Sequence, residues 1–328
     1  MDVEDILINP LIAVRDIHFV SSVIVAGIVF FDLFVVRAAD LRCSAAVAMF
    51  RSRTTTILWI CLVLSVLSGL AWLCLLSERI AGKPLGEVIT DGTIWIVLSR
   101  TQFGFAWDLR FLFGVMLAAW LWLRPASRAS AHFWQGFPAT LLAGAYLGSL
   151  AFAGHGQEGL GFERNIHLAA DVLHLIAAGL WLGGLIPLAL LLVYLRRFRE
   201  EAWTSAAYDA ASRFSNLGIF AVGVLLASGT ISASFLIGGV HSLVDTRYGQ
   251  LLLLKITLFA AMVGLAGFNR QYLLPRLCGD TGFDVSSRMV PWLVRSALAE
   301  IALGLGVIII VGMLGIMAPA SDVAVHVH

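Results

Sequence analysis

Residues 166–195 read IHLAADVLHLIAAGLWLGGLIPLALLLVYL, and this stretch decides the fold. A helix needs about 20 apolar residues to cross the hydrocarbon layer of a membrane. This stretch is longer than that, and Asp171 is its one formally charged residue. Seven further stretches have the same character, at residues 11–36, 54–76, 103–123, 137–153, 214–237, 251–274 and 292–317. Because the hydrocarbon layer offers no water to backbone N–H and C=O groups, these groups must form hydrogen bonds within their own segment. The sequence therefore predicts an all-α membrane bundle of eight transmembrane helices.

The composition agrees with this class of protein. Of the 328 residues, 59% are hydrophobic and 13% are charged, and the mean hydropathy is +0.90. These values exclude a soluble globular protein. The loops between the apolar stretches are short, so we expect residues 1–328 to form a single integral-membrane domain in contact with lipid. A net charge of +1 gives no reason to expect a nucleic-acid partner.

The basic residues predict how the chain is oriented in the membrane. Fourteen of the 22 Lys and Arg residues follow every second apolar stretch, and seven of the eight histidines lie at the opposite ends of those stretches. The basic positions are Arg37, Arg42, Arg51, Arg53, Arg124, Arg128, Arg196, Arg197, Arg199, Arg213, Arg270, Arg276, Arg288 and Arg295. Short loops rich in Lys and Arg stay in the cytoplasm. We therefore expect both termini, and most of the histidines, on the periplasmic side.

Residues 154–187 carry the strongest chemical signal. Asn165 is a candidate N-cap for a helix whose first turns present His167, Asp171 and His174. Spacings of four and three residues place these three side chains on one helix face. Because polar side chains are costly in contact with lipid, we expect this face to point into the bundle. Imidazole with carboxylate suits a first-row transition metal, with the aspartate either as a ligand or as an acceptor that orients an imidazole.

Other residues are needed to complete such a site. His167 and His174 lie roughly 10 Å apart along the helix axis, which is far for one shared ion. Either neighbouring helices complete one site or two sites form a relay. His155, in the Gly-His-Gly turn before this helix, and His18, in the first apolar stretch, are the candidates. The alternative is that these histidines form hydrogen bonds between helices.

Two methionines add soft ligands near the same level. Met313 and Met317 are four residues apart at the outer end of the last apolar stretch. Thioethers together with imidazoles favour copper, as Cu(I) more than Cu(II). The alternative is that both methionines fill the core.

Two acidic residues lie below the histidines, in the inner part of the membrane. Asp32 belongs to the first apolar stretch and Glu300 to the last. Ionisable residues within a membrane are costly and commonly serve function. We interpret the pair as parts of a transport path; the alternative is that they form ion pairs that fix the register of the helices.

Small residues predict how one helix packs. Gly179 and Gly183 are four residues apart and offer a face for close contact with a neighbouring helix, and Gly184 with Pro187 should bend the helix that carries them. The chain has no GxxxxGK[ST] run and no Cys-Pro-Cys. The sequence therefore does not indicate an ATP-driven pump.

Three runs of this sequence resemble the copper resistance protein D (CopD) family. They are NIHLAADVLHLIAAGLWLGGLIPL at 165–188, DTRYGQLLLLKITLFAAMVGLAGFNRQYLLPRL at 245–277 and RSALAEIALGLGVIIIVGMLGIMAPA at 295–320. The resemblance extends from the first apolar stretch, and residues 154–319 carry its most specific motifs. It implies a multi-pass protein of the bacterial inner membrane that is not an enzyme and takes copper from the periplasm into the cell. It also implies a separate periplasmic copper-binding partner of the CopC type.

One alternative function belongs to another class. Histidines on neighbouring helices can ligate haem iron, and the HemJ-type protoporphyrinogen oxidases combine a compact helical bundle with a histidine in the first helix. A membrane oxidoreductase with b-type haem is therefore the second hypothesis.

Overall fold

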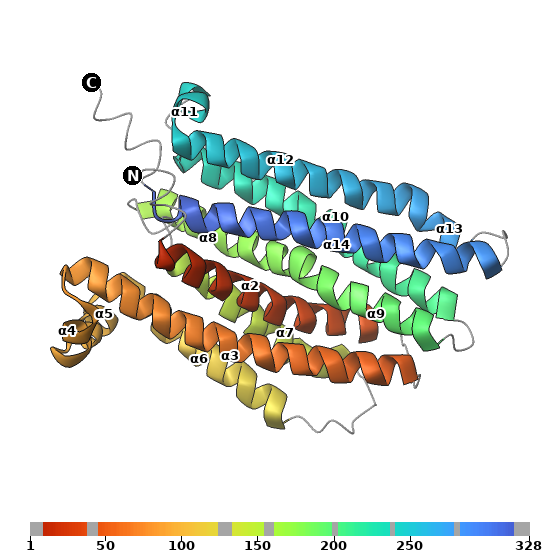
Figure 1. Cartoon of the computed structure of the whole chain (residues 1–328), viewed down its shortest axis with the longest axis horizontal. Helices are drawn as coiled ribbons and strands as arrows, with labels where there is room; N and C mark the ends of the chain where they lie inside the picture. The colour runs from red at the N-terminus through yellow and green to blue at the C-terminus, as the bar shows by residue number, and fades with distance from the viewer. Residues whose placement is uncertain are drawn as a thin grey trace.

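The computed structural model of the chain describes residues 9–37, 45–123, 133–153, 161–198, 203–236, 240–278 and 283–317. Within these ranges the regular elements are helices, and none is a strand. The long helices lie side by side in one bundle (Figure 1). They are α2 (Pro10–Phe31), α3 (Ala45–Ala81), α6 (Gln102–Leu123), α7 (Phe133–Gly148), α8 (Gly161–Ala178), α9 (Gly184–Phe198), α10 (Trp203–Leu236), α12 (Arg247–Phe268) and α14 (Phe283–Leu314).

Shorter helices continue or connect the long ones. They are η1 (Asp32–Arg37), α4 (Leu85–Thr90), α5 (Thr93–Arg100), η2 (Ser149–Ala153), η4 (Gly179–Gly183), α11 (Val240–Asp245), η5 (Asn269–Leu273) and α13 (Pro275–Cys278). Three of them, η1, η4 and η5, are π-helical. A π-helical turn inside a longer helix is rare and frequently lies at a functional site. Here η4 joins α8 to α9, and η5 follows α12 directly.

The prediction of eight membrane spans is confirmed. Among the described residues, eight helical stretches are long and apolar enough to cross a membrane. They are Pro10–Val36, Ala45–Ala81, Gln102–Leu123, Gly136–Ala153, Gly161–Phe198, Trp203–Phe235, Arg247–Leu277 and Met289–Leu314. Two helices begin well before the predicted apolar stretches: α3 begins at Ala45 rather than at residue 54, and α10 begins at Trp203 rather than at residue 214. Hydropathy identifies the part of a helix that suits lipid, whereas backbone hydrogen bonding continues past Arg51 and Arg53.

The first and last spans meet at one end of the bundle (Figure 1). The Arg15 guanidinium of α2 donates a hydrogen bond of 2.6 Å to the Gly315 carbonyl oxygen, just beyond α14. Eight spans place the start of the first helix and the end of the last helix on the same side of the membrane. Which end faces the periplasm remains a prediction from the charge pattern.

The centre of the bundle is a contact between two glycines. A Cβ atom added to Gly27 of α2 would collide with the backbone of Gly183 in η4, and one added to Gly183 would collide with the Val23 carbonyl oxygen. The predicted close-contact face at Gly183 is confirmed. At Gly179 the neighbour is the Leu147 side chain. Where we predicted a bend, the helix passes through the π-helical segment η4.

Apolar side chains pack in two main groups around this contact. One group lies among α2, α3, α6 and α7 and includes the fully buried Val25 and Leu147. The other lies mainly among α9, α10, η5 and α14 and includes the fully buried Leu191 and Leu192. Among the spans, α2 is the most buried, and α6 and α12 are the least buried. His167 of α8 and Glu300 of α14 are both buried inside the bundle.

Candidate functional site

Helix α8 carries the predicted metal-binding residues. It begins at Gly161, whose φ of +67° is in the left-handed region that glycine adopts without strain. Asn165 therefore lies inside the helix, and our prediction that it is the N-cap was wrong. The apolar periodicity starts only after Asn165, whereas the helix itself begins earlier with a turn that is exposed and includes Glu163. An acidic residue in the first turn stabilises a helix through its dipole.

Three residues of α8 face three residues of α10. The pairs are His174 with Ser228, Asp171 with Ser232, and His167 with Phe235. The first two are hydrogen-bonding contacts of 3.0 and 2.8 Å, and the third is a ring stack with centroids 5.0 Å apart. The predicted common face therefore exists and points into the bundle, where α10 holds each side chain in place.

The contact with Ser228 determines which nitrogen of His174 can bind a ligand. Ser228 has one hydroxyl proton, which it donates to the Val224 carbonyl oxygen at 2.6 Å. Towards His174 the hydroxyl can therefore only accept, so the imidazole proton is on Nδ1. The lone pair is then on Nε2, the nitrogen that remains available. A histidine whose other nitrogen is fixed in this way is the usual arrangement of a metal ligand.

The other two side chains of the set are less closely connected. His167 Nε2 lies 3.7 Å from Asp171 Oδ2, which is longer than a hydrogen bond. Within the described ranges, no three or more His, Cys, Asp or Glu side chains are grouped so that they could hold one metal ion. The structure therefore brings His167, Asp171 and His174 to one surface, but not to a common point.

That surface lines a cavity of about 420 Å³, which we call the outer cavity. Helices α2, α8, α12 and α14 all contribute to it, and most of the side chains around it are apolar. Its polar residues are Arg15, His167, Asp171, His174, Tyr248 and Lys255. Tyr248 and Lys255 both belong to α12.

Two cations of the outer cavity were not part of the predicted site. Lys255 lies within electrostatic reach of both Asp171 and His174, and Arg15 lies at the end near Gly315. Because Lys255 is a cation close to Asp171, the imidazoles are the stronger candidates as metal ligands. The Asp171 carboxylate accepts a hydrogen bond from Ser232 Oγ.

His18 lies on another side of α2, outside the outer cavity. Its Nδ1 lies 2.9 Å from the Ser65 carbonyl oxygen and 3.2 Å from Ser68 Oγ, and its ring lies 5.6 Å from those of Trp72 and Trp107. A carbonyl oxygen can only accept, so the imidazole proton is on Nδ1. His18 Nε2 is buried without a hydrogen-bond partner among the described residues. It thus has a free lone pair, but not beside His167 or His174.

The remaining predicted residues are not gathered at the outer cavity. Met317 packs against the cluster around Tyr248, and Met313 is half-buried in the last turn of α14. Asp32 begins η1 and does not line the cavity. His155 lies outside the described residues.

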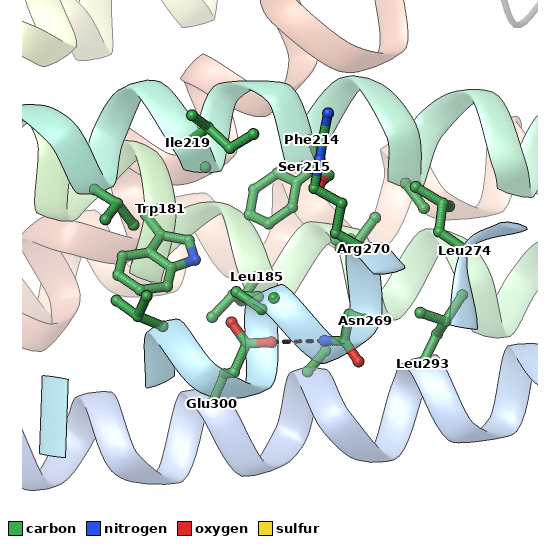
Figure 2. Close-up of a pocket in the computed structure, with 18 of the residues that line it drawn as sticks. Trp181, Leu185, Phe214, Ser215, Ile219, Asn269, Arg270, Leu274, Leu293 and Glu300 are labelled. Carbon is green, nitrogen blue, oxygen red and sulfur yellow. Dashed lines mark hydrogen bonds between the residues drawn. The ribbon is translucent and has the colours of Figure 1, made fainter. Parts of the chain in front are cut away.

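Glu300 lines a second cavity of about 220 Å³, which we call the inner cavity (Figure 2). Its carboxyl group is almost completely buried, with 2% of the residue exposed. Asn269 Nδ2 donates a hydrogen bond of 2.8 Å to Glu300 Oε1, and the Trp181 indole lies on the other side of the carboxyl group. Trp181 belongs to η4 and Asn269 to η5, so two π-helical segments supply the polar neighbours of Glu300.

The two cavities lie on either side of η4. Leu182 lines the outer cavity, and Trp181 lines the inner one. On α14, Val307 and Glu300 line the outer and inner cavities respectively. Seven residues of helix separate these two positions by about 10 Å. The two cavities therefore follow one another along the length of α14.

Models of two families match this chain. The model described as "Copper resistance protein D" matches residues 208–314, and the one described as "Copper resistance protein D-like, N-terminal domain" matches residues 4–165. No solved structure matches the chain.

Three curated proteins resemble the chain over most of its length. Inner membrane protein YebZ of Escherichia coli (strain K12) is 30% identical over 311 residues, which are 94% of this chain and 98% of that protein. Copper resistance protein D of Pseudomonas syringae pv. tomato is 30% identical over 328 residues, 96% of this chain and 98% of that protein. Copper transport protein CutJ of Bacillus subtilis (strain 168) is 31% identical over 310 residues, 93% of this chain but 52% of that protein.

Proposed function

Because the chain belongs to the copper resistance protein D family, we propose that it binds copper in the outer cavity and passes it across the inner membrane into the cell. It is a multi-pass inner-membrane protein, and its relatives carry copper resistance and copper transport in their names. These names point to transport rather than to catalysis.

One observation carries the proposal. His167 and His174 line a cavity within the membrane, and the contact with Ser228 leaves the His174 Nε2 lone pair available. Imidazole nitrogens suit copper. Since one helix cannot bring both rings to one ion, we propose that copper is held by one imidazole at a time or together with a ligand from another segment. His155, Met313 and Met317 remain the predicted partners for that role.

The inner half of the route is proposed from the second cavity. Copper that leaves His174 has to pass η4, beyond which Glu300 lines the inner cavity. Asp32, at the start of η1, remains a predicted path residue further along the first span. We propose in addition that a separate CopC-type periplasmic protein delivers the copper, because Arg15 and Gly315, which line the outer cavity, lie near the end of the bundle that the charge pattern assigns to the periplasm.

The direct test uses the purified chain in lipid vesicles. We expect vesicles that contain it to accumulate copper several times faster than protein-free vesicles, and metal analysis to find copper retained by the protein. An absorption spectrum of the same sample tests the second hypothesis. A Soret band of about one haem per chain, without copper accumulation, would replace the copper proposal with a haem oxidoreductase.

The orientation has its own test. We expect a reporter fused after His328 to behave as periplasmic and one placed between Arg196 and Arg213 to behave as cytoplasmic, because basic loops are retained inside. Alkaline phosphatase activity and green fluorescence at the two positions measure this. The reverse pattern would place the outer cavity at the cytoplasmic end and reverse the proposed direction.

A further inference from the structure

The inner cavity holds a carboxyl group that lacks a cation partner among the described residues. Glu300 contacts the amide of Asn269 and the indole of Trp181, both of which are neutral. The other charged residue that lines the cavity is Arg270. Its guanidinium donates to Ser215 Oγ and Asn216 Oδ1, each at 2.9 Å, and in Figure 2 it extends away from Glu300.

The other elements around the cavity do not supply a countercharge. Segment η4 and helices α9, α10 and α12 contribute only uncharged side chains to the described lining. An ionised carboxylate in such a place is costly, because it has neither water nor an opposite charge beside it. Binding a proton removes that cost. A buried acid of this kind therefore has two states, neutral when the cavity is undisturbed and ionised when a positive charge comes near.

The donor atoms of this cavity do not suit copper as a resident ligand. Besides the Glu300 carboxyl group they are the Asn269 amide and the Ser215 hydroxyl, and Asn269 Oδ1 is buried without a hydrogen-bond partner among the described residues. No described His, Cys or Met lines the inner cavity. Copper prefers nitrogen and sulfur, whereas a buried carboxyl group without a countercharge suits a proton.

We propose that the inner cavity is a proton-binding site, in which Glu300 takes the proton and releases it when copper occupies the outer cavity. The geometry supplies the coupling. Glu300 lies about 10 Å from the outer cavity along α14, and opposite charges attract at that separation in a medium of low dielectric constant. A copper ion in the outer cavity therefore favours the ionised form of Glu300. The coupling to copper rests on the proposed function, whereas the proton site itself does not.

Infrared spectroscopy of the purified full chain tests the proton site directly. At neutral pH we expect the carbonyl stretching band of a protonated carboxylic acid in the wild-type protein, its loss in Glu300→Gln, and its retention in Glu87→Gln. Glu87 is exposed in α4, far from the cavity, and serves as the matched control. The glutamine side chain introduced by Glu300→Gln retains an oxygen that can accept the Asn269 hydrogen bond. Absence of the band in the wild type, or its persistence in Glu300→Gln, would overturn the proposal.

A second variant keeps the test decisive if Glu300→Gln does not fold. Asn269→Ala keeps the acid and removes the hydrogen bond to Oε1. The band should then shift towards the frequency of a free acid. An unshifted band would show that the protonated acid is another residue.

Vesicles with a pH difference across the membrane test the coupling. We expect the copper uptake rate of the wild type to change severalfold with the direction of the pH difference, and that of Glu300→Gln to be independent of it. Uptake by the wild type that ignores the pH difference would overturn the coupling and leave copper transport intact. If the wild type moves no copper at all, the proposed function fails, and the infrared band still decides whether Glu300 binds a proton.

Discussion

His174→Ala is expected to lower the initial rate of copper uptake into vesicles by roughly tenfold or more, since even changes beside a metal ligand cost that much. The substitution removes the Nε2 lone pair that faces the outer cavity. It should not unfold the protein, because Ser228 still donates its proton to the Val224 carbonyl oxygen and no polar group is left without a partner. Uptake of radioactive copper and copper bound per chain measure the effect.

Two control variants test whether the loss of uptake is specific to the His174 imidazole. His241→Ala removes an exposed histidine of α11 that does not line the cavity, and should leave uptake unchanged. Ser228→Ala keeps the imidazole but removes the acceptor that fixes its ring, and should have a smaller effect than His174→Ala. Wild-type uptake in a well-folded His174→Ala protein would mean that the histidine only connects α8 to α10.

Gly183→Val is expected to prevent the bundle from forming in its native arrangement. The new side chain would meet the Val23 carbonyl oxygen and the Cα atom of Gly27, which are backbone atoms and cannot rotate away. Overpacking of a core costs about 1–3 kcal/mol even where side chains can move, so we expect about 3 kcal/mol or more here. The yield of monodisperse protein and its thermal unfolding temperature measure this loss.

Gly264→Val is the matched control for that substitution. Gly264 lies in α12 and has no neighbouring atom within 4 Å of the position that a Cβ would take. We expect wild-type yield and thermal stability for it. Equal stability of Gly183→Val would show that α2 and η4 can separate without loss of the fold.

The sequence predicted the features that depend on one helix at a time. Eight spans follow from runs of apolar residues, and the common face of His167, Asp171 and His174 follows from their spacing. The close contact at Gly183 was predictable as well, because a small residue on an apolar helix indicates a near neighbour. The identity of that neighbour, Gly27, was not predictable.

The features that the sequence did not reveal depend on how helices are paired in space. Ser228 and Ser232 are ordinary polar residues in α10 until that helix is placed against α8. Trp181 and Asn269 face Glu300 from η4 and η5, and apolar runs in the sequence do not reveal that these two segments are π-helical. Lys255 is one basic residue in an apolar stretch until α12 is placed beside α8, where it lines the outer cavity.

Because the first and last spans contact each other, the outer cavity is completed late in synthesis. Helix α2 leaves the ribosome first and α14 last, yet Arg15 of α2 and Val311 of α14 line the same cavity, and the Arg15 guanidinium binds the Gly315 carbonyl oxygen. Until α14 has been inserted, the nascent chain lacks one side of the outer cavity and Arg15 lacks its acceptor. The outer cavity is therefore complete only after α14 has been inserted, and a chain cut short before α14 contains His167, Asp171 and His174 but lacks the α14 side of the cavity.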